Sequence, residues 1–234
     1  MPRGPRHAPG GLVYHCINRA AAGQTLFRDD GDYAAFQRIL REGLDRVPMR
    51  VLAFCVMPNH FHLVCWPRKD GHLSAYLRWV TNTHTKRWRA HTHTAGHGAV
   101  YQGRFKSFPC QSDHHYLTVL RYVERNPLRA NLVASAADWP WSSLGRRRAD
   151  GTVADGEDEL LHDGPVPLPS DWTRLVQRPQ SQAELDALHL AVKRNQPFGD
   201  PAWQRSTARR LGLAHTLRPQ GRPRKRPKTT RSTA

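Results

Sequence analysis

Two histidines one residue apart, His60 and His62, interrupt the apolar run from Val56 to Trp66. A β-strand alternates its side chains between two faces, so residues two apart point to the same side, about 7 Å apart at their Cα atoms. We therefore expect Phe61 and Leu63 to face a core while both imidazoles face the other way. The spacing suits two ligands that converge on one metal ion, but by itself it suits a polar surface pair equally well.

Two imidazoles leave a metal ion incompletely coordinated, and a predicted helix further along the chain offers another ligand. Residues four apart share a helix face, so Thr118, Tyr122 and Asn126 form one polar stripe. A tyrosine among cations, one turn from an amide oxygen, could attack a phosphate. The alternative is a tyrosine half-buried where the helix packs on a sheet. Three arginines flank the stripe: Arg121, Arg125 and Arg129.

The remaining potential metal ligands favour other interpretations. His91, His93 and His97 lie in a Gly/Thr-rich stretch at the end of a predicted helix, which is typical of a solvated loop rather than a zinc site. The cysteines occur singly, mostly in apolar runs, and form no Cys-x-x-Cys pair. We expect buried thiols in a reducing compartment, not disulfides. The four cysteines are Cys16, Cys55, Cys65 and Cys110.

The charge of the chain predicts a polyanionic partner. Its 234 residues include 36 Lys and Arg against 19 Asp and Glu, a formal net charge of +17. This balance is typical of proteins that bind or process nucleic acids. The N-terminal sequence MPRGPRHAPGG has no apolar segment typical of a signal peptide, and no apolar stretch approaches the length of a membrane span. We therefore expect a cytoplasmic protein that does not associate with a membrane.

The elements that must position these residues follow from apolar periodicity. Their order predicts an α+β fold, a ferredoxin-like four-stranded antiparallel sheet with helices on one face and the histidine face open to a ligand. The nearly all-apolar strand 51–57 should be central, and Pro109 should place strand 105–111 at an edge. Ser112 or Asp113 should cap a third helix that ends near Pro127. The other predicted strands are 12–18 and 61–66, and the other helices are 31–47 and 73–91.

Composition divides the chain into four predicted regions. Residues 1–145 contain every motif above and form the predicted catalytic domain. An acidic and Pro-rich insertion or linker follows over 146–182, then a small helical C-terminal region over 183–216. Residues 217–234 form a basic tail that we expect to be disordered.

Three stretches carry a family resemblance. MPNHFHLV, residues 57–64, resembles the HUH motif, in which a hydrophobic residue separates two histidines. YLTVLRYVERNPLRANLV, residues 116–133, followed by DWPWSS, is similar to the tyrosine-helix region of single-tyrosine HUH transposases. Within that superfamily, also called IS200-like, the chain most resembles the REP-associated tyrosine transposases of bacteria. The resemblance covers roughly residues 10 to 145.

This resemblance implies a divalent ion, Mg²⁺ or Mn²⁺, and cleavage and rejoining of single-stranded palindromic hairpin DNA through a 5′-phosphotyrosine. By position, His60 and His62 match the metal-binding histidines and Tyr122 matches the nucleophile. Asn126 matches the third ligand, where many relatives carry Gln or Glu. We expect a monomer or homodimer in the bacterial cytoplasm, associated with the nucleoid. The predicted DNA contacts are Arg104, Lys106, Arg121, Arg125, Arg129, Arg222 and Arg224.

Two other functions fit the same residues. A domesticated protein could recognise hairpin DNA without turnover, and a metal-dependent phosphodiesterase that uses water would keep the histidines but not need Tyr122. The tail sequence PQGRPRKRPK, residues 219–228, resembles an AT-hook that enters the minor groove. A generic basic tail that contacts phosphates explains it as well.

Overall fold

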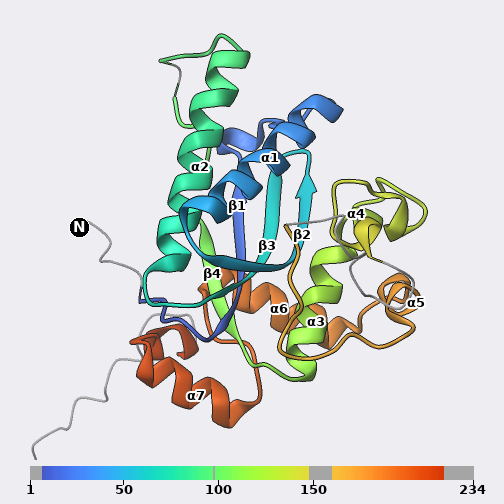
Figure 1. Ribbon diagram of the computed structural model, residues 1–234. Coiled ribbons are helices and arrows are strands. Elements are labelled where there is room, and N and C mark those ends of the chain that lie inside the picture. The colour runs from blue at the N-terminus through green and yellow to red at the C-terminus, as the bar shows by residue number, and fades with distance from the viewer. Residues whose placement is uncertain (1–6, 97, 148–159, 219–234) are drawn as a thin grey trace, which may run out of the picture.

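Four strands form one antiparallel sheet in the order β2-β3-β1-β4 (Figure 1). The structure is a computed structural model that describes residues 7–96, 98–147 and 160–218. Along the chain the order is the predicted β-α-β-β-α-β, which confirms the α+β class and the four-stranded antiparallel sheet. The elements are β1 (Val13–Arg19), α1 (Asp30–Arg46), β2 (Met49–Met57), β3 (His60–Pro67), α2 (His72–His91) and β4 (Lys106–Cys110).

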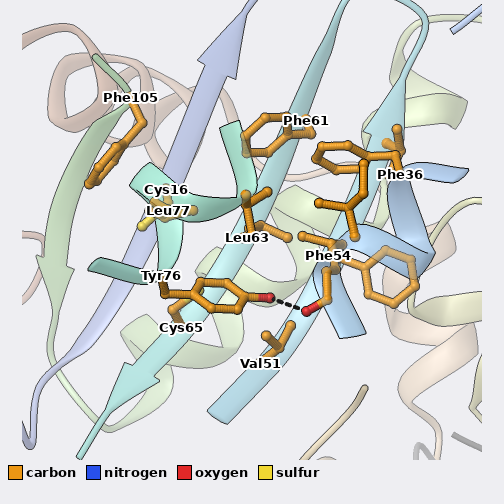
Figure 2. Close-up of a cluster of buried hydrophobic side chains, with 14 of the residues drawn as sticks. Cys16, Phe36, Val51, Phe54, Phe61, Leu63, Cys65, Tyr76, Leu77 and Phe105 are labelled. Atoms are coloured by element: carbon orange, nitrogen blue, oxygen red, sulfur yellow. Dashed lines mark hydrogen bonds between the residues drawn. The ribbon is translucent and has the colours of Figure 1, made fainter. Parts of the chain in front are cut away.

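Helices α1 and α2 cover one face of the sheet and enclose the main core (Figure 2). Phe36 of α1 stacks near Phe61 of β3, with ring centroids 4.9 Å apart. The Tyr76 hydroxyl of α2 donates to the Leu40 carbonyl oxygen of α1 at 2.9 Å, which joins the two helices. Burying each such large apolar side chain stabilises the fold by about 1.5–3 kcal/mol. The face that carries Phe61 and Leu63 is therefore core, as predicted.

The opposite face is also covered, so the expectation of an open histidine face was wrong. His62 is only 1% exposed. Leu120 and Val123 of the tyrosine helix are fully buried and belong to a second core with Val64 and Phe108. The apolar stripe of that helix must be removed from water, and this sheet face is the surface that receives it. The covering helices are α3 (His114–Glu124), α4 (Asn126–Arg129) and α6 (Gln182–Arg194), and α5 (Trp172–Gln177) packs against α3.

Helix α3 begins and ends at local signals. The Asp113 carboxylate accepts from the His115 backbone N–H at 2.8 Å, which confirms one of the two predicted caps. The helix ends at Glu124, before Pro127, whose ring nitrogen cannot donate to the helix ladder. The chain then resumes as the one-turn helix α4, which starts at Asn126.

Strand β2 lies at an edge of the sheet, so its predicted central place was wrong. Later segments cover this edge: the Val56 N–H donates to the Trp141 oxygen, and the Ser143 N–H donates to the Phe54 oxygen, both at 2.9 Å. The strand has the apolar sequence typical of a central strand because these segments bury it, although they are not strands of the sheet. Strand β4 is the other edge, as Pro109 indicated.

The C-terminal region packs against β4. The Phe198 N–H donates to the Pro109 oxygen at 2.9 Å, and Asp200 then caps α7 (Pro201–Arg210). Leu161 and Trp172, from the segment predicted as an insertion or linker, are buried against the rest of the chain. The acidic residues 148–159 and the tail 219–234 lie outside the described residues, and the four region boundaries stay predictions. Short 3-10 helices complete the fold: η1 (Ala21–Gly23), η2 (Ala136–Asp138), η3 (Leu144–Arg146) and η4 (Ala214–Leu217).

The four cysteines are buried free thiols, as predicted. None of the helices within the described ranges has both the length and the apolar character that crossing a bilayer requires.

Candidate active site

The two histidines lie side by side at the start of β3. His60 is partly exposed and His62 is buried, with ring centroids 5.0 Å apart. In the register of the sheet, His60 pairs with Arg19 and His62 with Ile17 of β1. Phe61 between them points into the opposite core. Strand alternation therefore places both imidazoles on one face, as the sequence predicted.

The tyrosine helix brings its polar residues to this pair. The Asn126 side-chain nitrogen lies 2.9 Å from His62 Nε2, and the Tyr122 ring centroid lies 5.8 Å from that of His62. Asn126 is 4% and Tyr122 5% exposed. Four residues predicted from separate motifs thus meet within one chain: His60, His62, Tyr122 and Asn126.

Arg129 fixes the orientation of the Asn126 amide. Its guanidinium donates to Asn126 Oδ1 at 3.1 Å and lies 4.3 Å from the centroid of the Tyr122 ring. Because a guanidinium has donors only, the amide oxygen must face Arg129 and the amide N–H must face His62. His62 Nε2 is then an acceptor, with its lone pair directed at the amide.

Both histidines are neutral and hold their protons on Nδ1. Burial, with the charges of Arg19 and Arg129, lowers the pKa of His60 to about 4, and burial holds the pKa of His62 well below its usual value. His60 Nδ1 lies 2.7 Å from the Asn59 side-chain oxygen, to which it can only donate. Each Nε2 therefore keeps a lone pair, which is the form of imidazole that binds metals.

A cleft of about 900 Å³ opens beside Tyr122. It is strongly cationic, and the described residues that line it include no carboxylate. The cations come from β1, from β4 and the loop before it, from α4 and from α6: Arg19, Arg104, Lys106, Arg129 and Lys193. Of the predicted DNA contacts, Arg104, Lys106 and Arg129 thus share one cleft with the tyrosine.

Two other predicted contacts point elsewhere. Arg121 donates to the carbonyl oxygens of Arg178 and Pro179, at 3.1 and 2.7 Å. Arg125 donates to the carbonyl oxygens of Val176, at 3.0 Å, and Gln177. Neither arginine lines the cleft. Arg125 holds the end of α5 against the tyrosine helix, and Arg121 holds the segment that follows α5. Arg222 and Arg224 lie outside the described residues.

Sequence reasoning missed the contribution of α6. His189 and Lys193 are four residues apart, and both line the cleft. The His189 ring centroid lies 6.0 Å from that of Tyr122. The i, i+4 spacing was the available signal, but it could not say which surface the helix covers.

Sequence reasoning also missed a buried carboxylate behind the tyrosine. Glu124 is fully buried and accepts from Ser143 Oγ at 2.5 Å, Arg147 Nε at 2.9 Å and Trp172 Nε1 at 2.6 Å. It lies two positions after Tyr122 along the helix. Glu124 therefore ties the tyrosine helix to segments that lie far along the chain.

A second group of potential ligands lies at the other end of α3. Asp113, His114 and His115 offer ligand atoms within 4.8 Å of one another. Asp113 already accepts from the N–H and the Nδ1 of His115, which its role as a helix cap explains. At 1.5 Å per residue this group lies about 12 Å along the helix from Tyr122. Of the histidine cluster predicted to be a loop, His91 ends α2, His93 follows it in a turn, and His97 lies outside the described residues.

Residues 10–126 match the sequence family described as Transposase IS200 like, from before β1 through Asn126. The chain belongs to this family. The predicted membership is confirmed, and it makes the chain a transposase of a DNA-cleaving family whose members generally depend on a metal ion. Helix α6 lies beyond the matched residues.

The relatives of this transposase point to one subgroup. A REP-associated tyrosine transposase of Escherichia coli is 27% identical over 117 residues, 48% of this chain and 64% of the relative. A Haemophilus influenzae protein assigned to the same subgroup is 22% identical over 119 residues, 47% of this chain and 68% of the relative. A solved REP-associated tyrosine transposase bound to a REP hairpin shares the fold, with a TM-score of 0.53 and 21% identity over 69% of this chain and 94% of that one.

Proposed function

We propose that this transposase binds single-stranded DNA folded into a REP-type hairpin, and that it cleaves and rejoins the strand through a 5′-phosphotyrosine on Tyr122. One observation carries the proposal: Tyr122 lines a cationic cleft and its ring also lies beside that of His62. The hairpin partner is carried over from the structural neighbour, which was solved with a REP hairpin. Since one chain supplies all four residues, we propose that a monomer suffices. We also propose that it acts beside the chromosome in the bacterial cytoplasm.

The residues fit a divalent ion. His60 and His62 would hold it through their Nε2 lone pairs. Asn126 would hold it through Oδ1 after its amide turns over, because at present its N–H faces His62 Nε2 and its oxygen accepts from Arg129. A bound Mg²⁺ or Mn²⁺ would polarise the scissile phosphate and offset the charge that develops on it. A carboxamide is a weaker ligand than a carboxylate, so the two histidines would contribute most of the affinity for the ion.

The side chains of the cleft define the reaction. Tyr122 Oη attacks phosphorus and loses its proton, the bond to the 3′ oxygen breaks, and that oxygen takes up a proton. The products are a 5′-phosphotyrosine and a free 3′-OH. Because one phosphoester bond replaces another, a 3′-OH can reverse the step without an external energy source. Arg129 lies over the tyrosine ring, where it can hold the phosphate in line with Oη and stabilise negative charge on it.

The test uses labelled single-stranded hairpin DNA with Mn²⁺, followed by a denaturing gel. The wild type should leave the 5′ end of the cleaved strand attached to protein, and peptide mapping should find it on Tyr122. Tyr122→Phe removes one oxygen and should bind DNA normally but form no adduct. Tyr116→Phe is the matched control, because Tyr116 lies on the same helix but is buried away from the cleft.

The competing functions predict different gels. A phosphodiesterase that uses water would still cut after Tyr122→Phe, and a domesticated binding protein would cut in neither form. His62→Ala should abolish cleavage while most hairpin binding remains, because phosphate contacts dominate affinity. Cleavage at the wild-type rate in His62→Ala would exclude the metal site proposed here.

A further inference from the structure

A third histidine lies behind the metal-binding pair. His15, in the middle of β1, is fully buried, and its Nε2 lies 2.8 Å from His62 Nδ1. Its ring packs on Phe108, with centroids 4.8 Å apart. Its other nitrogen, Nδ1, has no hydrogen-bond partner among the described residues.

Packing alone does not account for a histidine at this position. An unpaired buried N–H costs about 1–3 kcal/mol, whereas an apolar side chain of similar shape would avoid that cost. The His15 ring lies against Phe108 and near the rings of His62 and Tyr122, and an apolar side chain could pack against all three rings. The hydrogen bond to His62 is therefore the contact that a histidine provides and an apolar residue cannot.

The positions of the protons give that hydrogen bond a direction. Arg129 orients the Asn126 amide, whose N–H points at His62 Nε2, so His62 carries its proton on Nδ1. That proton can be donated only to His15 Nε2. His15 must then carry its own proton on Nδ1, the unpaired nitrogen. The unpaired N–H is thus a consequence of using the opposite nitrogen as an acceptor.

We propose that His15 is a positioning residue, which holds His62 in the Nδ1–H tautomer and fixes its ring so that the Nε2 lone pair points to the metal. This inference rests on the proposed function. Hydrogen bonds behind a ligating histidine orient the ring and make the free nitrogen more basic, and losing them typically costs about 10–100-fold in metal affinity.

The test measures Mn²⁺ binding to the full chain in the absence of DNA, from the electron paramagnetic resonance signal of free Mn²⁺. His15→Leu should raise the Mn²⁺ dissociation constant about 10–100-fold. The melting temperature of the metal-free protein should change little, because the variant removes the unpaired N–H of His15 but leaves the buried His62 Nδ1–H without its acceptor. His15→Gln should restore most of the affinity, since its side-chain oxygen can accept from His62 Nδ1–H. His84→Gln, which changes a buried histidine on the other face of the sheet, should leave Mn²⁺ affinity unchanged.

Several outcomes would overturn the inference. Unchanged Mn²⁺ affinity in His15→Leu would remove the positioning role, and a His15→Leu chain that does not fold would show that the histidine serves packing. Equal losses in His15→Gln and His15→Leu would also contradict a role as acceptor. If His62→Ala leaves Mn²⁺ binding intact, the proposed function itself fails. A wild type that forms the tyrosine adduct while His15→Leu binds Mn²⁺ normally would refute only the role of His15.

Discussion

Two lysines from separate elements should each contact a phosphate of the same DNA strand. Lys106 projects from β4 and Lys193 from the far end of α6, and both line the cleft that holds Tyr122. If a single strand crosses that cleft to reach the tyrosine, each ammonium group neutralises one phosphate. The double variant Lys106→Ala/Lys193→Ala then removes two such contacts.

The size of the effect follows from counterion release. For single-stranded DNA each phosphate contact contributes about −0.7 to the slope of log affinity against log salt, so the double variant should lose about 1.4 of the slope. Between 50 and 200 mM salt, a fourfold change, the wild type should therefore lose about sevenfold more affinity than the variant.

The assay is fluorescence anisotropy with a labelled single-stranded hairpin, in the Tyr122→Phe background so that no strand is cut. The matched control is Lys69→Ala/Lys86→Ala, which removes the same charge from exposed positions that do not line the cleft. The control should keep nearly all of the slope. Equal slopes for the two double variants would refute the path of the strand through the cleft.

Three further outcomes follow from the structure. Glu124→Ala should lower the free energy of unfolding in urea by about 3–5 kcal/mol, since it leaves Arg147 buried without its carboxylate; a loss below 1 kcal/mol would contradict the buried ion pair. Burial lowers the pKa of His84 to about 4, so the unfolded chain binds its proton first as the pH falls. His84 alone should account for about 2 kcal/mol of the stability lost between pH 7 and 5, and His84→Gln should remove that share while the other buried histidines keep theirs. Deleting residues 219–234, which hold six Lys and Arg, should reduce the salt slope by at most about 4; an unchanged slope would show that the tail does not contact this DNA.

Local periodicity explains what could be predicted from sequence. A period of two puts His60 and His62 on one face of β3, and a spacing of four puts Tyr122 of α3 and Asn126, which starts α4, on one side of the helical segment. These relations hold for any strand and any helix, whatever lies opposite. The order of strands and helices follows from the same periods, and so the sheet was predictable too.

The same local rules could not assign the arginines. Arg121, Arg125 and Arg129 recur at one spacing along the segment that forms α3 and α4, yet only Arg129 lines the cleft. The other two donate to carbonyl oxygens of residues 176–179, which are more than fifty positions later in the chain. The charge of an arginine predicts that its side chain will donate to some acceptor. Which acceptor lies within reach depends on the path of the later segment.

Only the tertiary structure brings His15 to His62. In the sequence it is one of fourteen histidines, set between Tyr14 and Cys16. The register of β1 against β3 pairs Ile17 with His62, which makes His15 the diagonal neighbour of His62 on the same face. A slip of one residue would turn His15 to the other core. That register is set by the burial of both faces of the sheet. This burial depends on many long-range contacts, which a local sequence pattern does not contain.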